Sequence, residues 1–179
     1  MKTLATFLVC AFALGDASAA SAQAHPDIAA PKPHAHSAVA ASSMDVPANA
    51  QQAVAVVDAF GHALAAGDLN TVESLLDAEV LILESGGAER SREQYLGHHA
   101  ISDARFLKDS QREIAYRKAR VAGDLAWVAS ESKIQVAKDG NILSLLSSET
   151  MVLRHGPDGW RIIHIHWSSR PQKNSGETP

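Results

Sequence analysis

Two histidines near the C-terminus have the spacing of a pair that can bind a metal or transfer a proton. His164 and His166 lie in the run 160–169. In a strand, side chains two positions apart point to the same face, so both imidazoles share a face with Trp160 and Ser168. Large apolar groups occur on both faces, which predicts a strand buried on both sides. Such a pair can chelate a metal, hold an anion or pass a proton; the alternative is a polar layer of the core.

A second histidine pair, His98-His99, falls in a predicted helix over residues 91–107. Stepping 100° per residue places His99 and Asp103 beside the apolar side of this helix, one turn apart, and His98 on the solvated side. Asp103 can therefore orient the His99 imidazole, as carboxylates orient catalytic or metal-bound histidines. The alternative is an ordinary surface contact between residues four apart.

Two glutamates are candidates for the same site. Glu84 follows Val80 and Ile82 with a period of two, so its carboxylate should project to the side of those apolar groups. Glu149 is flanked by apolar residues on its own face, where desolvation penalises a charge unless it is paired or protonated. Glu131 lies in a more polar strand and ranks below both.

These residues support three hypotheses. In the first, a pocket performs general acid/base chemistry: His99 or His166 removes a proton, and Glu84 or Glu149 orients the base. In the second, His99, His164 and His166 bind zinc or copper, with Glu84 or Glu149 completing or supporting the ligand set. In the third, the domain is a non-catalytic binding or dimerising module, and the histidines form a structural polar cluster.

The surrounding pattern predicts the elements that position these side chains. Apolar residues at helical spacing indicate a helix over 51–66 that ends at Gly67, and a short second helix follows the N-cap Asp68. A strand over 79–85 and the helix over 91–107, which opens with the capping-box residues Ser91 and Gln94, come next. Four strands separated by tight turns complete the domain, over 112–121, 125–138, 142–155 and 160–169. Three helices on one face of a strongly bent antiparallel sheet make an α+β fold.

The last two strands resemble a known family. Segments 149–154 (ETMVLR) and 159–171 (GWRIIHIHWSSRP) are similar to the closing hairpin of exported SnoaL-like proteins of the nuclear transport factor 2-like superfamily. The final strand also resembles that of the association domain of calcium/calmodulin-dependent protein kinases. The similarity extends upstream through Glu84-Ser85-Gly86-Gly87 and the run 95–99 (YLGHH), and covers about residues 50–171.

This resemblance implies a cone-shaped curved sheet, the nuclear transport factor 2-like or cystatin-like roll, with a small-molecule pocket at its open end and frequent homodimerisation through the sheet. It places His164 and His166 in the pocket and His99 near its mouth, with Tyr95, Trp160 and Ser168 as further pocket residues. Enzymes of the superfamily commonly transfer protons with an Asp or His inside the cone. Isomerases, dehydratases, polyketide cyclases and assembly hubs share the fold.

The rest of the chain indicates export. Residues 1–24 have the order of a secretory signal peptide, with Lys2 before an apolar run too short to cross a bilayer. We expect a periplasmic or secreted protein without a membrane anchor after cleavage. Residues 25–49 form a predicted flexible leader, which we interpret as a soluble tether; a loose copper or zinc site at His25, His34 and His36 is the alternative. Residues 50–171 form the domain and 172–179 a disordered tail.

Composition excludes two further classes. The only cysteine, Cys10, lies inside the predicted signal peptide, so the mature chain has neither disulfides nor thiol chemistry. The 16 basic and 20 acidic residues are scattered, without the basic stripe that nucleic acid requires.

Overall fold

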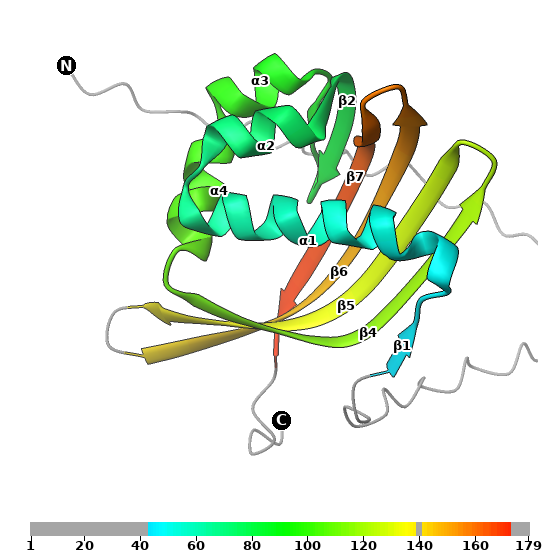
Figure 1. Ribbon diagram of the computed structural model, residues 1–179. Helices are drawn as coiled ribbons and strands as arrows, with labels where there is room; N and C mark the ends of the chain where they lie inside the picture. Colours follow the sequence, from blue (N-terminus) through cyan, green and yellow to red (C-terminus); the bar gives the residue numbers. More distant parts are fainter. Residues whose placement is uncertain (1–42, 139–140, 173–179) are drawn as a thin grey trace, which may run out of the picture. The chain divides into compact units, whose positions relative to one another are not determined.

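The computed structural model describes residues 43–138 and 141–172, and the fold is α+β as predicted. The predicted signal peptide, most of the predicted leader and the end of the tail lie outside these residues. The elements in chain order are β1 (Ser43–Asp45), the 3-10 helix η1 (Ala48–Ala50), α1 (Gln51–Ala66), α2 (Leu69–Leu75), β2 (Leu76–Glu84), β3 (Gly87–Glu89), α3 (Arg92–Gly97), α4 (His99–Leu107), β4 (Ser110–Ala122), β5 (Leu125–Lys138), β6 (Asn141–Gly156) and β7 (Gly159–Pro171). The α-helices cover one face of a curved sheet, with α1 lying across it (Figure 1).

The sheet is mixed, which corrects the prediction that it is antiparallel. Its strand order is β1-β4-β5-β6-β7-β2-β3, and it does not close on itself. The meander from β4 to β7 is antiparallel, as the turns predicted. Two pairings between strands distant in sequence, β1 with β4 and β2 with β7, are parallel. Hydrophobic periodicity identifies strands but not their non-sequential partners, so these pairings were not predicted.

The helix predicted over 91–107 is two helices, so the described residues contain four α-helices rather than three. Ser91 caps α3 by accepting a hydrogen bond from Gln94 N, as the capping-box spacing indicated. At His98 the backbone leaves the helical region, with φ −135° and ψ −85°, and α4 begins at His99. The break changes the direction of α4, which carries both His99 and Asp103, relative to α3.

The core lies between α1 and the sheet. Val57, Phe60 and Leu64 on α1 are at most 2% exposed and share one helix face, as the sequence indicated. They pack in one cluster with inward residues of the strands, including Ile82 and Met151. Each such side chain contributes about 1.5–3 kcal/mol when it is removed from water. Within the described part of the chain, no helix is long and apolar enough to span a membrane.

A β-bulge in β7 determines which of its side chains face this core. His164 pairs with Val152 of β6 and Ile162 pairs with Leu153, so Ile163 is an extra residue on β7. Ile162 and Ile165 are consequently both buried, although they are three positions apart. The residues that alternate with Ile165 beyond the bulge therefore face away from the core.

The hairpin between β2 and β3 places two glutamates on one face. Ser85 and Gly86 form its two-residue turn, with φ angles of 43° and 90°. Positive φ at both positions is the conformation of a type I′ turn, which matches the twist of the flanking strands. Ile82 lies opposite Glu89, and Glu84 opposite Gly87, so Glu84 and Glu89 are diagonal neighbours on the inner face.

The ordered domain begins earlier than the pattern indicated. Ser43–Asp45 form strand β1, inside the segment for which the sequence predicted a flexible leader. Arg120 donates to both Asp45 carboxylate oxygens, at 3.0 and 2.7 Å, and Lys118 Nζ lies 3.6 Å from the same carboxylate. All three residues of β1 are exposed, so a hydrophobic pattern could not reveal this strand.

Candidate functional site

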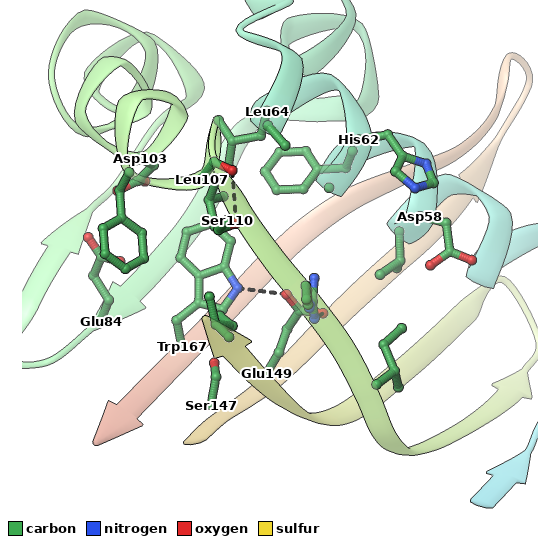
Figure 2. Close-up of a pocket in the computed structure, with 18 residues that line it drawn as sticks. Asp58, His62, Leu64, Glu84, Asp103, Leu107, Ser110, Ser147, Glu149 and Trp167 are labelled. Carbon is green, nitrogen blue, oxygen red and sulfur yellow. Dashed lines mark hydrogen bonds and ion pairs between the residues drawn. The ribbon is translucent and has the colours of Figure 1, made fainter. Parts of the chain in front are cut away.

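A cavity of about 410 Å³ lies between α1, α4 and the inner face of the sheet. Much of its wall is apolar and comes from Phe60, Leu64, Phe106, Leu107, Ile134 and Trp167. Its charged lining residues are Asp58, Glu84, Asp103, Arg112 and Glu149. Figure 2 shows Glu84 and Asp103 on one side of the Trp167 indole and Glu149 on the other. An apolar cavity with a few convergent polar groups is the usual form of a small-molecule site.

Asp103 is held by a tyrosine at one end of the cavity. The hydroxyl of Tyr95, which is fully buried, donates to Asp103 Oδ2 at 3.0 Å. Burial raises the pKa of the Asp103 carboxyl above its usual value, and the Tyr95 hydrogen bond and the charge of His99 oppose this only in part. Burial and the Asp103 charge likewise raise the pKa of the Tyr95 hydroxyl, so Tyr95 stays a hydrogen-bond donor. Asp103 forms no ion pair with any described residue, so burial sets the direction of its pKa shift.

Glu84, the last residue of β2, faces the same cavity. It projects to the side of Val80 and Ile82, as its period-two spacing predicted, and those two side chains are fully buried. Burial and the neighbouring Asp103 charge raise the pKa of the Glu84 carboxyl. This end of the cavity thus holds two carboxyl groups that burial disfavours in their charged forms.

His99 lies beside this pair but does not bond Asp103, contrary to the prediction. Its Nδ1 contacts Glu89 Oε1 closely and lies 3.9 Å from Glu84 Oε1. His99 and Asp103 keep their i,i+4 spacing within α4, but the His99 imidazole turns to Glu89 and Asp103 accepts from Tyr95 instead. His98 is exposed, as predicted.

Glu149 is fully satisfied at the other end of the cavity. It is 6% exposed, accepts from Arg112 Nη2 at 3.1 Å and accepts from Trp167 Nε1 at 2.9 Å. Arg112 Nε also donates to Ser132 at 3.3 Å. Of the two states that its apolar flanks indicated, paired or protonated, Glu149 has the paired one. Because both carboxylate oxygens are bound, Glu149 is an anchor for Arg112 and Trp167 rather than a proton carrier.

This combination of fold and cavity has relatives. Residues 53–171 match the model of the SnoaL-like domain, which is most of the chain. The chain belongs to the SnoaL-like family. This confirms the resemblance of its last two strands to that family, within the nuclear transport factor 2-like superfamily.

Solved structures agree with the SnoaL-like assignment. A protein of Shewanella frigidimarina, provisionally named a ketosteroid isomerase, is 34% identical, with a TM-score of 0.64 over 71% of this chain and 100% of that chain. A provisionally named calcium/calmodulin-dependent protein kinase II association domain from Xanthomonas campestris is 27% identical, with a TM-score of 0.58 over 72% and 94%. A provisionally named dehydratase from Streptomyces avermitilis, 23% identical with a TM-score of 0.56 over 70% and 97%, shares the fold. A comparison with curated proteins gave no match.

In this SnoaL-like domain the predicted β7 histidines do not line the cavity. His166 is exposed and His164 is half-buried, with its Nδ1 2.9 Å from the Leu81 carbonyl oxygen. Ser168 is exposed on the same outer face. The bulge at Ile163 is the reason, because it turns Ile165 and Trp167 inward and the alternate residues outward. The structure therefore does not bring His164 and His166 together with His99.

Trp160 and Tyr95, which were also predicted to line the pocket, lie outside the cavity wall. Trp160 is half-buried, packs against the core and lies edge-on to His155, with ring centroids 5.0 Å apart. It does not line the cavity. Tyr95 does not line the cavity but contacts two residues that do, Asp103 by a hydrogen bond and Trp167 with ring centroids 6.3 Å apart. Glu131 is exposed, in keeping with its lower rank.

Several site residues were missed by sequence reasoning. Trp167 stacks on Phe60 with ring centroids 6.2 Å apart and forms part of the cavity wall. The available signal was the strand alternation, which places Trp167 and His166 on opposite faces of the same strand. Arg112 is one polar residue among several at the start of β4, and Glu89 ends a three-residue strand too short for a periodic pattern.

Proposed function

We propose that this chain is a small-molecule acid/base enzyme of isomerase or dehydratase type, in which Asp103 transfers the proton. The observation that carries the proposal is the Asp103 carboxyl itself, which faces a 410 Å³ cavity with a bound tyrosine hydroxyl and no ion pair within the described residues. Burial raises its pKa toward the working pH, which is the condition for efficient proton transfer. The Shewanella relative named as an isomerase supports the same reaction class.

The proposed reaction starts with a carbonyl compound whose apolar body lies against Phe60, Phe106 and Trp167. The Asp103 carboxylate takes a proton from the carbon next to the carbonyl, and the electron pair moves onto the carbonyl oxygen. Where the substrate has a C=C bond next to that carbon, the proton returns to the far carbon of this bond. The C=C bond shifts into conjugation with the restored carbonyl, which completes an isomerisation. The Tyr95 hydroxyl holds Asp103 in place throughout.

Arg112 is the cation that lines the cavity and can stabilise the negative oxygen. Its Nε and Nη2 are bound by Ser132 and Glu149. Its Nη1 lies 3.7 Å from the position of a Cβ at Gly61, an ordinary van der Waals distance, so the guanidinium lies close to α1 at the cavity wall.

The test works whatever the product of the reaction is. A panel of ketones is incubated with the protein in D₂O, and exchange of the protons next to the carbonyl is followed by ¹H NMR. We expect D103N to slow the exchange by about 10²- to 10⁴-fold, the range that one positioned acid/base group contributes.

The matched control is D109N, which changes an exposed aspartate two residues beyond the end of α4 in the same way. Its exchange rate should equal that of the unaltered protein. If ketones quench the fluorescence of Trp167 but no proton exchanges, the cavity is a binding site without turnover. Equal exchange in D103N and D109N would assign the chemistry to another residue.

A second candidate function is a dimerising binding module, favoured by the outer face of the sheet. Leu81 and Leu83 on β2, and Leu125 and Trp127 on β5, are 36–42% exposed on the face opposite the helices. Two solved relatives are named as a kinase association domain and a kinase hub. We propose homodimerisation through this face, which L81D/L83D should disrupt in sedimentation measurements without emptying the cavity of ligand.

Export to the periplasm or medium also stays a proposal. It rests on residues 1–24, which lie outside the described residues. Fractionation of expressing cells, with N-terminal sequencing of the product, tests both export and the cleavage position.

A further inference from the structure

Glu89 is a buried carboxylate that the proposed proton transfer does not use. It is 5% exposed at the end of β3, and its Oε1 contacts His99 Nδ1. Its Oε2 is buried without a hydrogen-bond partner. Buried polar atoms in folded proteins almost always have a partner, so an oxygen in this position calls for a cation or a donor beside it.

Glu89 stands with two other groups that can bind a metal. One ligand atom each from Glu84, Glu89 and His99 lie within 4.8 Å of one another. The three residues come from β2, β3 and the first turn of α4. The type I′ turn at Ser85-Gly86 sets the two glutamates on one face, and Gly87 opposite Glu84 places no side chain between them. The break at His98 brings the imidazole to the same point.

We propose that Glu84, Glu89 and His99 form a binding site for a divalent transition cation, with Zn²⁺ as the fitting probe. Zinc binds carboxylate oxygen and imidazole nitrogen at about 2.0–2.2 Å, which places neighbouring ligand atoms a little over 3 Å apart. The 3.9 Å from Glu84 Oε1 to His99 Nδ1 closes to that value with a small rotation of the Glu84 side chain. The cation would join two carboxylates that otherwise repel each other and supply the partner that Glu89 Oε2 lacks.

Three protein ligands leave at least one coordination position open, as in catalytic rather than structural zinc sites. Glu84 also lines the cavity, so the open position is at the edge of the cavity, beside Asp103. This site goes beyond the proposed proton transfer, which uses Asp103, Tyr95 and Arg112. Either proposal can fail without the other.

The outer pair His164 and His166 is the competing metal site. Its imidazoles lie on the opposite face of the sheet, and the Leu81 carbonyl oxygen accepts the Nδ1 proton of His164. No carboxylate joins them in a group of three ligand residues among the described residues. His25, His34 and His36 lie outside the described residues and stay unchanged in every variant, so their contribution is constant.

The experiment is zinc titration of the metal-free, full-length protein by calorimetry, with four variants in parallel. We expect E89Q and H99A each to weaken one zinc equivalent by about 100-fold or more, above the effect of losing a group that merely supports a metal ligand. E79Q, an exposed glutamate of the same strand as Glu84, and H164A/H166A should keep full affinity.

Thermal unfolding gives a second measurement for variants whose folding is in doubt. Zinc should raise the Tm of the unaltered protein and of E79Q, because it binds the folded state, and should leave the Tm of E89Q and H99A unchanged. Loss of zinc in H164A/H166A with retention in E89Q would overturn the proposal. Equal zinc binding by all variants, or none by the unaltered protein, would also overturn it and leave His99–Glu89 as an ion pair only.

Discussion

The two ends of the cavity differ in whether their buried carboxylates have bound partners. At the Glu149 end, Arg112 and Trp167 bind both carboxylate oxygens of Glu149. At the Asp103 end, Glu84, Glu89 and Asp103 gather with one imidazole, and one Glu89 oxygen has no partner. Removing one partner of a satisfied buried charge is costly because the other charge is left unpaired, whereas an unsatisfied buried charge already lowers stability. The comparison separates the end that holds the cavity together from the end that can do chemistry.

The largest effect on stability should come from removing Arg112, which binds the buried Glu149 carboxylate. R112M leaves Glu149, whose side chain is 5% exposed, with the Trp167 hydrogen bond alone. We expect a loss of about 2–4 kcal/mol in the free energy of unfolding, because a buried charge without its partner is costly. Urea unfolding measures this loss. The double variant R112M/E149M should recover part of it; additive losses would show that the two residues are not coupled.

A smaller effect on stability is expected from removal of the Tyr95 hydroxyl that donates to Asp103. Y95F removes the hydroxyl that binds Asp103 and should lower the free energy of unfolding by about 1 kcal/mol. The hydrogen bond lowers the pKa of Asp103, so its loss should raise that pKa further. The acid limb of the proton-exchange rate should then move to higher pH. Y116F, a change outside the cavity, is the control and should leave the limb in place.

Replacement of the Asp103 carboxyl by a neutral amide should stabilise the folded protein. D103N should raise the free energy of unfolding at pH 7 by about 0.5–1 kcal/mol while it abolishes the chemistry, the usual opposition of stability and function. This outcome has the reverse sign of the R112M effect. Urea unfolding of D103N beside D109N measures it, and a destabilised D103N would place Asp103 with the structural residues.

The pH dependence of stability follows from the same raised pKa. The folded state prefers neutral Asp103, so its stabilising contribution is fully present below the usual pKa of 3.8. It is lost as the pH rises through the raised folded-state pKa. Urea unfolding between pH 4 and 8 should show a shallower decline in D103N than in D109N, and equal slopes would contradict the raised pKa.

The smallest effect on stability is expected from replacement of the two histidines on the outer face of the sheet. H164A/H166A should change the free energy of unfolding by less than about 0.5 kcal/mol per residue, because surface substitutions rarely do more. The lost contact of His164 with the Leu81 carbonyl oxygen is its main cost. A loss of several kcal/mol in urea unfolding would mean that these imidazoles are packed more tightly than their exposure indicates.

The sequence predicted the elements of the domain better than the site. Caps, turns and apolar spacing locate the main helices and strands, and period-two alternation correctly turns Glu84 inward with Ile82. The buried, paired state of Glu149 also follows from its apolar flanks. These features depend on neighbours in the chain, which a single sequence displays.

The rest depends on contacts between distant segments or on single irregular residues. Glu89 meets His99 only because a two-residue turn and a helix break bring them together. Asp103 accepts from the Tyr95 hydroxyl of α3 and not from His99, although His99 lies one turn away in the same helix. One extra residue in β7 reverses the expected sides of its histidines, and no alternation rule reveals a bulge.

That single extra residue, Ile163, decides which kind of ring lines the cavity. Because it shifts the pairing by one residue, Ile162 and Ile165 both face inward although they are three positions apart. Deletion of Ile163 would leave them two positions apart, so Ile165 and Trp167 would stay inward and the imidazoles would stay outside. The same residues paired without a bulge, with Ile162 inward, would instead turn His164 and His166 to the cavity. The choice between an indole and an imidazole in the cavity wall is therefore made by the bulge, and the His-x-His motif alone does not reveal it.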